Sequence, residues 1–66
     1  MKITLNGKPQ EFTSPVNLHS LVQRYCPNKP QIIVELNGHI IKRHEWKMKA
    51  VSDGDIIELV NVVGGG

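Results

Sequence analysis

The stretch DGDIIELVNVV, residues 53–63, decides the fold, because it holds the most apolar strand that the chain can form. A turn signal, Ser52-Asp53-Gly54-Asp55, comes first, and β-branched residues and leucine fill most of positions 56–63. Side chains alternate between the two faces of a strand, which places Ile57 and Leu59 together on the inward face. The outward face then carries Glu58, Val60 and Val62. Such an apolar strand is suited to the centre of a sheet.

The N-terminal segment predicts a β-hairpin. Residues 1–6 alternate between apolar and polar side chains, which is the period of a half-buried strand. Asn6-Gly7 supplies two residues that readily take positive φ in a tight turn. We expect a return strand over residues 10–13, with Phe12 facing inward. Pro9 at its start cannot donate a ladder hydrogen bond, so this strand belongs at the edge of the sheet.

The middle of the chain predicts one helix. Apolar side chains recur at the i, i+3, i+4 and i+7 spacing of a single helix face, at Leu18, Leu21, Val22 and Tyr25. Asn17 is a favourable N-cap, and Cys26-Pro27 ends the helix because the residue before a proline avoids helical geometry.

A second hairpin follows the helix. Residues 32–36 form an apolar strand with Val34 and Leu36 inward, Asn37-Gly38 forms the turn, and residues 39–41 form a short return strand. The polar segment 42–49 around Trp46 is expected to be an irregular loop or one helical turn.

The predicted order is strand, strand, helix, strand, short strand, strand. A short chain buries its single helix by packing it across one sheet, and the last strand fits beside the first, parallel to it, after a right-handed crossover. This is an α+β, ubiquitin-like β-grasp with a mixed four- to five-stranded sheet. We assign residues 1–63 to the domain and residues 64–66 to a flexible glycine tail.

Composition excludes several classes of function. The chain has 66 residues and a net charge of +2, which is too small a charge to indicate nucleic-acid binding. A domain of this size has a thin core, so a deep catalytic cleft is not expected. One cysteine forms no internal disulfide, and neither a membrane span nor a signal peptide is evident. We expect a reducing, cytoplasmic setting, with no nucleic-acid and no membrane partner.

Few side chains offer chemistry of their own. His39 and His44 lack the helical spacing of metal ligands, so we expect no metal site and solvated histidines. Cys26 is a conceivable nucleophile, but a small, half-buried apolar role suits a lone cysteine at a helix end. The basic run KRHEWKMK, residues 42–49, either contacts phosphates or is a solvated loop held by Trp46.

The glycine tail points to different chemistry. Gly64 and Gly65 have no side chains, so they form a thread that can enter a slot too narrow for other residues. The thread presents the α-carboxylate of Gly66, which becomes a useful electrophile only after activation, for example by ATP-driven adenylation. A frayed terminus or a cloning remnant are the plainer readings. The outward Glu58, Val60 and Val62 lead toward the tail and are expected to form a docking surface.

The chain resembles the ThiS family, the sulfur carriers of thiazole formation in thiamine biosynthesis. The resemblance covers the whole chain, from MKITLNG at the start to DGDIIELVNVVGGG at the end. The internal stretch LNGHIIKRHEW adds Ile41, Arg43 and Trp46, while Lys42 stands where the family usually has proline. Gly65-Gly66 matches the functional end of the family.

The resemblance implies a mechanism in which this protein is a carrier and co-substrate, not an enzyme. An adenylyltransferase of the ubiquitin-activating type uses ATP to adenylate Gly66, and a sulfur donor such as a cysteine desulfurase converts the adenylate to a thiocarboxylate. Thiazole synthase then accepts the tail and takes the sulfur. No cofactor is bound by the carrier.

Three alternatives remain open from the sequence. One is a sulfur carrier of another pathway, similar to the small subunit of molybdopterin synthase, although those chains usually run longer. Another is a protein modifier whose terminal glycine is joined to lysine. The third is a β-grasp interaction module with an incidental tail.

Overall fold

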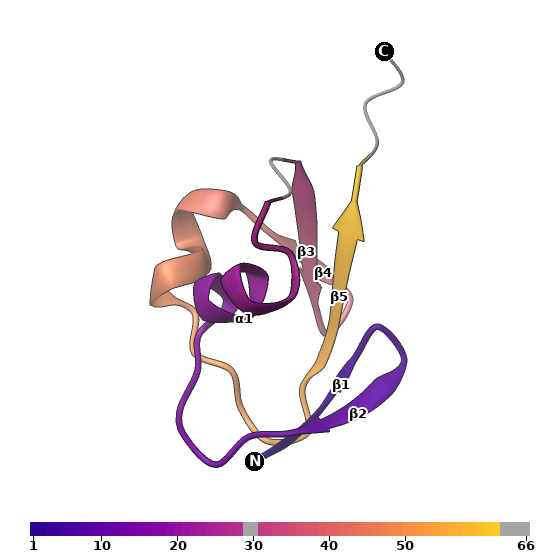
Figure 1. Ribbon diagram of the computed structural model, residues 1–66, viewed down its shortest axis with the longest axis vertical. Helices are drawn as coiled ribbons and strands as arrows, with labels where there is room; N and C mark the ends of the chain where they lie inside the picture. The colour runs from indigo at the N-terminus through magenta and orange to yellow at the C-terminus, as the bar shows by residue number, and fades with distance from the viewer. Residues whose placement is uncertain (29–30, 63–66) are drawn as a thin grey trace.

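The computed structural model describes residues 1–28 and 31–62 (Figure 1). Val63, which the sequence assigned to the last strand and to the end of the domain, lies outside the described residues, as does the tail 64–66. The elements in chain order are β1 (Lys2–Leu5), β2 (Lys8–Glu11), α1 (Leu18–Tyr25), β3 (Ile32–Leu36), β4 (His39–Ile41), the 3₁₀ helix η1 (Arg43–Met48) and β5 (Ile56–Asn61).

The five strands form one mixed sheet in the order β2-β1-β5-β3-β4. The last strand is central, as predicted: β5 runs parallel to β1 and antiparallel to β3. Figure 1 shows α1 packed across one face of this sheet, and no other described helix covers the opposite face. The prediction of a ubiquitin-like β-grasp with a mixed sheet and one helix is confirmed. We call the uncovered side the open face.

Both hairpins close through Asn-Gly loops of two residues. Asn6 and Gly7 have φ values of 50° and 80°, and Asn37 and Gly38 have 52° and 86°. Positive φ at both central positions is what a type I′ turn requires, and its twist matches that of the flanking strands. These turns join β1 to β2 and β3 to β4 at the places that the sequence indicated.

The return strand of the first hairpin begins earlier than predicted. β2 covers Lys8–Glu11 and not residues 10–13, because a two-residue loop lets pairing restart at once, with Lys8 opposite Leu5. Pro9 lies on an edge strand, as expected. Phe12 follows the strand yet is buried, and its N–H donates to the Met1 carbonyl at 2.8 Å.

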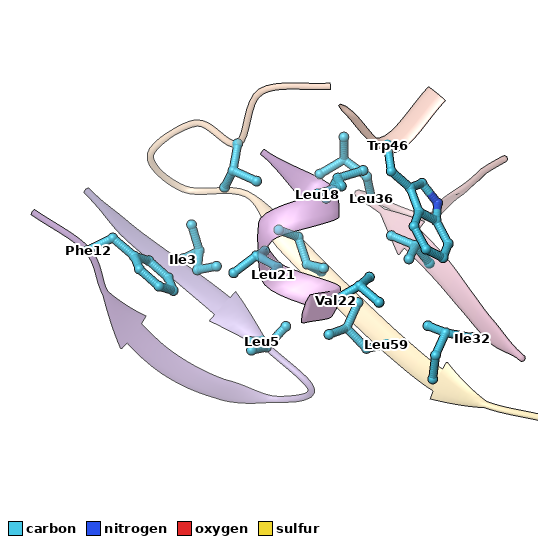
Figure 2. Packing of buried hydrophobic residues seen from close by; sticks show 13 residues of the cluster. Ile3, Leu5, Phe12, Leu18, Leu21, Val22, Ile32, Leu36, Trp46 and Leu59 are labelled. Atoms are coloured by element: carbon cyan, nitrogen blue, oxygen red, sulfur yellow. The ribbon is translucent and has the colours of Figure 1, made fainter. Parts of the chain in front are cut away.

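The helix has the predicted caps, and its buried face is narrower than the predicted one. The Asn17 side-chain oxygen accepts a hydrogen bond from the Ser20 N–H at 2.8 Å, and Cys26 is the C-cap. Figure 2 shows Leu18, Leu21 and Val22 pointing into the core. Tyr25, the last residue of the predicted apolar face, is 41% exposed because it is the last residue of the helix and lies outside the core.

The segment before β5 is more regular than expected. Residues 43–48 form a 3₁₀ helix, and Trp46 is buried, with its indole N–H donating to the Ile41 carbonyl at 2.9 Å. Lys42 has φ −70°, close to the value that a proline ring imposes. Its N–H donates to the Glu45 carboxylate at 3.3 Å, a bond that proline cannot make.

Candidate functional site

The central strand leads directly to the predicted site. Gly64, Gly65 and Gly66 lie outside the described residues, so the structure describes the approach to the tail and not the tail. Val62 is the last described residue, and its N–H donates to the Gln31 carbonyl at 2.9 Å. The pairing with the chain on the β3 side therefore extends to the last residue that the structure describes.

Two neighbouring strands hold β5 in place. On the β3 side, five residue pairs form a register that runs from Leu36 opposite Ile57 to Ile32 opposite Asn61. On the β1 side, the strand pairing stops at Leu5 opposite Ile57. Beyond it, the Asn6 side chain bonds to both backbone groups of Leu59. Strand β5 is therefore hydrogen-bonded on both sides as far as Leu59.

The two faces of β5 differ as the alternation predicted. Ile57 is 0% exposed and Leu59 6%, and both belong to the core beneath α1. Val60 is 45% exposed and Val62 40%, and Glu58 is exposed between the core positions. The three outward residues thus lie on solvent-accessible surface that approaches the tail. Their docking role remains a prediction.

The open face also contains residues that the sequence analysis did not single out. Glu35 lies directly opposite Glu58, and Ile33 lies opposite Val60. On the next strand, Ile40 lies opposite Glu35. The alternation around the inward Val34 and Leu36 implied that Ile33 and Glu35 face outward, but only the strand order shows which residues stand beside them.

Cys26 and the basic run 42–49 both pack against the body of the domain. Within residues 1–28 and 31–62, no group of three or more His, Cys, Asp or Glu side chains is placed to hold a metal ion. Cys26 is a half-buried free thiol packed against the core. The basic run 42–49 is held by Trp46, and the Arg43 guanidinium lies 5.2 Å from the centre of that indole ring. The expected anchoring of this segment by Trp46 fits the structure, with a 3₁₀ helix in place of a loop, and contact with phosphates stays an alternative.

A hollow of about 340 Å³ lies at the edge between the first hairpin and the segments that flank α1 and β5. Its lining is Met1, Phe12, Thr13, Ser14, Pro15 and Val51. The side chains of this lining include no acid, imidazole or thiol group. Among the described residues, no helix has the length and apolar character needed to cross a membrane.

Comparisons with a family model, with related sequences and with solved structures all point to the same family. The family model described as the ThiS family matches residues 3–66. The sulfur carrier protein ThiS of Bacillus subtilis is 32% identical over 65 residues, which cover 97% of this chain and 98% of that protein. The thiazole synthase of Paramagnetospirillum magneticum is 30% identical over 66 residues, which are all of this chain but 20% of that protein.

A solved structure agrees in fold and in length. The crystal structure of the thiamine biosynthesis protein ThiS from Geobacter metallireducens superposes with a TM-score of 0.85 at 32% identity, and the match covers 100% of both chains. The likeness therefore extends over the whole length of both chains. On the family match over residues 3–66 and this structural likeness, the chain belongs to the ThiS family.

Proposed function

We propose that this protein carries sulfur on the terminal carboxyl group of Gly66 and donates it to thiazole formation in thiamine biosynthesis. The observation that supports this most directly is the family match, which runs to residue 66 and so includes all three terminal glycines. The similar Bacillus subtilis protein is a sulfur carrier. In this proposal strand β5, which is paired on both sides, serves as the base from which the thread 64–66 reaches a partner's active site.

The proposed chemistry has two steps on the carrier. The Gly66 carboxylate oxygen attacks the α-phosphorus of ATP on an adenylyltransferase of the ubiquitin-activating type, and pyrophosphate leaves. A nucleophilic sulfur then attacks the acyl carbon, and AMP leaves with the bridging oxygen. When sulfide is the nucleophile, loss of its proton leaves the thiocarboxylate. In the cell a cysteine desulfurase is the proposed source of sulfur, and the carrier acts as a co-substrate without a bound cofactor.

Thiazole synthase is the proposed acceptor. One thiazole synthase supports that link. A fifth of that protein is similar to the whole of this chain, so a carrier-like segment and a synthase share one polypeptide there. We place Glu58, Val60 and Val62 in the surface that docks the carrier on its partners. A reducing, cytoplasmic location belongs to the same proposal.

Intact-mass measurement tests the proposal. The chain is incubated with the adenylyltransferase from the same genome, ATP and sulfide, and we expect the mass change of one terminal oxygen replaced by sulfur. Omitting ATP is the control and should leave the mass unchanged. Covalent attachment to other proteins would instead indicate a modifier. An unchanged mass with an enzyme that is active on another ThiS protein would reject the carrier function. A thiocarboxylate that thiazole synthase refuses would point to another pathway.

A further inference from the structure

The two Asn-Gly turns share a chemical reactivity that neither the fold nor the proposed function uses. An asparagine that precedes glycine is prone to spontaneous deamidation, because no side chain hinders the attack of the glycine nitrogen on the asparagine side-chain carbonyl. Gly7 and Gly38 are both exposed, and open space lies where a Cβ atom would project from either of them. The surroundings of Asn6 and Asn37 differ, however, and this difference decides which turn reacts.

Asn6 is held by hydrogen bonds that are partly shielded from water. Its side-chain oxygen accepts from the Leu59 N–H at 2.7 Å, its side-chain nitrogen donates to the Leu59 carbonyl at 3.3 Å, and both bonds are part-buried. Deamidation requires the amide to leave this position, which would strip both backbone groups of Leu59 of their partner. Leaving partly buried polar groups unpaired is costly. The folded structure therefore protects Asn6.

Asn37 is held by hydrogen bonds that lie in exposed positions. Its side-chain oxygen accepts from the Ile56 N–H at 2.8 Å, and its side-chain nitrogen donates to the Asp55 carboxylate at 3.0 Å. Water can replace the amide in both bonds, so the side chain leaves at little cost. The turn also ends in β4, a strand of three residues at the edge of the sheet. Exposed turns of this kind open locally more easily than the centre of a sheet.

His39 supplies a further feature at the second turn. Its ring Nδ1 lies 3.2 Å from the Asn37 carbonyl oxygen, and because that oxygen can only accept, the protonated Nδ1 is the donor. The Asn37 carbonyl and the Gly38 nitrogen belong to one peptide group. When this nitrogen loses its proton, the negative charge is shared with the carbonyl oxygen, and a hydrogen-bond donor there stabilises it. Among residues 1–28 and 31–62, no side chain donates to the corresponding carbonyl of Asn6.

We propose that Asn37-Gly38 is a self-modifying site, at which the folded protein converts asparagine to aspartate and isoaspartate ahead of Asn6-Gly7. The Gly38 nitrogen bonds to Cγ of Asn37, the Cγ–Nδ2 bond breaks, and ammonia leaves with the proton of the glycine nitrogen. Water then opens the five-membered imide at either of its two carbonyl carbons. The net change replaces a side-chain NH₂ by OH, with water and ammonia as the only other reactant and product.

This modification should loosen the start of β5. A carboxylate at position 37 would face the Asp55 carboxylate where the amide now donates at 3.0 Å, and like charges repel. Isoaspartate lengthens the backbone of a two-residue loop, which conflicts with the pairing of Leu36 with His39. The backbone bond from the Asn37 N–H to the Ile56 carbonyl, 2.7 Å long, lies in the same turn. Both products therefore weaken the link between the second hairpin and the first residue of β5.

Incubation of the folded chain in water enriched in oxygen-18, at physiological temperature and neutral pH, tests the proposal. Peptide mapping afterwards in ordinary water reports only the deamidation that occurred during incubation. We expect one heavy oxygen at position 37, in both products, with a rate about tenfold higher than at Asn6. In guanidinium chloride the two rates should become similar. Absence of label at position 37, a rate at Asn6 that is equal or higher, or the same ratio after unfolding would overturn the proposal.

The role of His39 is tested in the same assay. We expect His39→Leu to slow labelling at position 37 about threefold, because the Asn37 carbonyl loses its donor. The rate at Asn6 is the internal control and should not change. Asn37→Gly, which accepts the positive φ of the turn, should remove the label from this peptide. An unaltered rate at Asn37 in the His39→Leu variant would overturn the assignment of His39.

Thermal unfolding tests the consequence for the fold. Asn37→Asp should lower the unfolding temperature, and Asn37→Asp/Asp55→Asn should restore most of it, because the amide and the carboxylate then exchange places. Equal unfolding temperatures of Asn37→Asp and the unaltered chain would contradict the predicted repulsion. None of these measurements needs a partner or sulfur, so their outcome is independent of the proposed carrier function.

Discussion

The Asn6 side chain makes two hydrogen bonds to the backbone of Leu59, in the place where a longer strand β1 would pair with β5. Its side-chain oxygen accepts from the Leu59 N–H at 2.7 Å, and its side-chain nitrogen donates to the Leu59 carbonyl at 3.3 Å. The backbone of β1 cannot make these bonds, because the chain turns back at Gly7. One turn residue therefore both closes a hairpin and extends the pairing of the central strand toward the tail.

Removing this side chain should destabilise the domain. We expect Asn6→Gly to lower the free energy of unfolding by about 1–3 kcal/mol, because both backbone groups of Leu59 lose a partner. Glycine accepts the positive φ of this position, so the loss reports the side chain and not backbone strain. Urea unfolding measures the stability, and hydrogen exchange at the Leu59 amide should become faster. Asn28→Gly, at an exposed turn, is the control; an equal loss there would contradict the interpretation.

Core packing between the helix and the sheet should dominate stability. Leu18 is 0% exposed, and we expect Leu18→Ala to cost about 2–5 kcal/mol through lost burial and a residual cavity. That is a large part of the stability of a small domain. Ser20→Ala on the exposed side of the same helix should be neutral or slightly stabilising, since alanine favours helix. Thermal and urea unfolding of the two variants give the comparison, and similar losses would reject this account.

Trp46 should be a structural residue. We expect Trp46→Phe to lower the free energy of unfolding by about 1–3 kcal/mol, because the Ile41 carbonyl loses its indole donor and a smaller ring leaves space. Met48→Leu is the control in the same 3₁₀ helix, since Met48 is 80% exposed. Sulfur loading of the Trp46→Phe variant under folding conditions should be unchanged. Loss of loading in a folded variant would assign Trp46 a functional role.

The tail should be separable from the fold. Deletion of Gly65 and Gly66 should leave the unfolding transition unchanged, because the core is built from residues within 1–28 and 31–62. The same deletion should abolish the gain of sulfur, since the acceptor carboxyl group is then displaced from the partner's active site. Circular dichroism and intact mass report the two properties. A deletion variant that fails to fold would contradict the idea of a free thread.

Most of the fold could be predicted from local patterns. The Asn-Gly dipeptides place both turns, the period of Leu18, Leu21 and Val22 places the helix, and the apolar last strand predicts its central position. These features depend on backbone conformation and hydrophobic spacing, which are properties of neighbouring residues. The predicted boundaries of β2 and the predicted burial of Tyr25 were wrong, because both depend on where strand pairing and core packing stop.

By itself, the sequence determined the order of elements, the inward and outward positions of β5 and the three glycines on which the proposed carrier chemistry depends. Only the tertiary structure decided that Glu35 stands opposite Glu58, that Ile33 stands opposite Val60 and that Asn6 reaches Leu59. The physical reason is register: a strand's own alternation sets which face each residue takes, whereas its neighbour across the sheet depends on how distant segments align when the core forms.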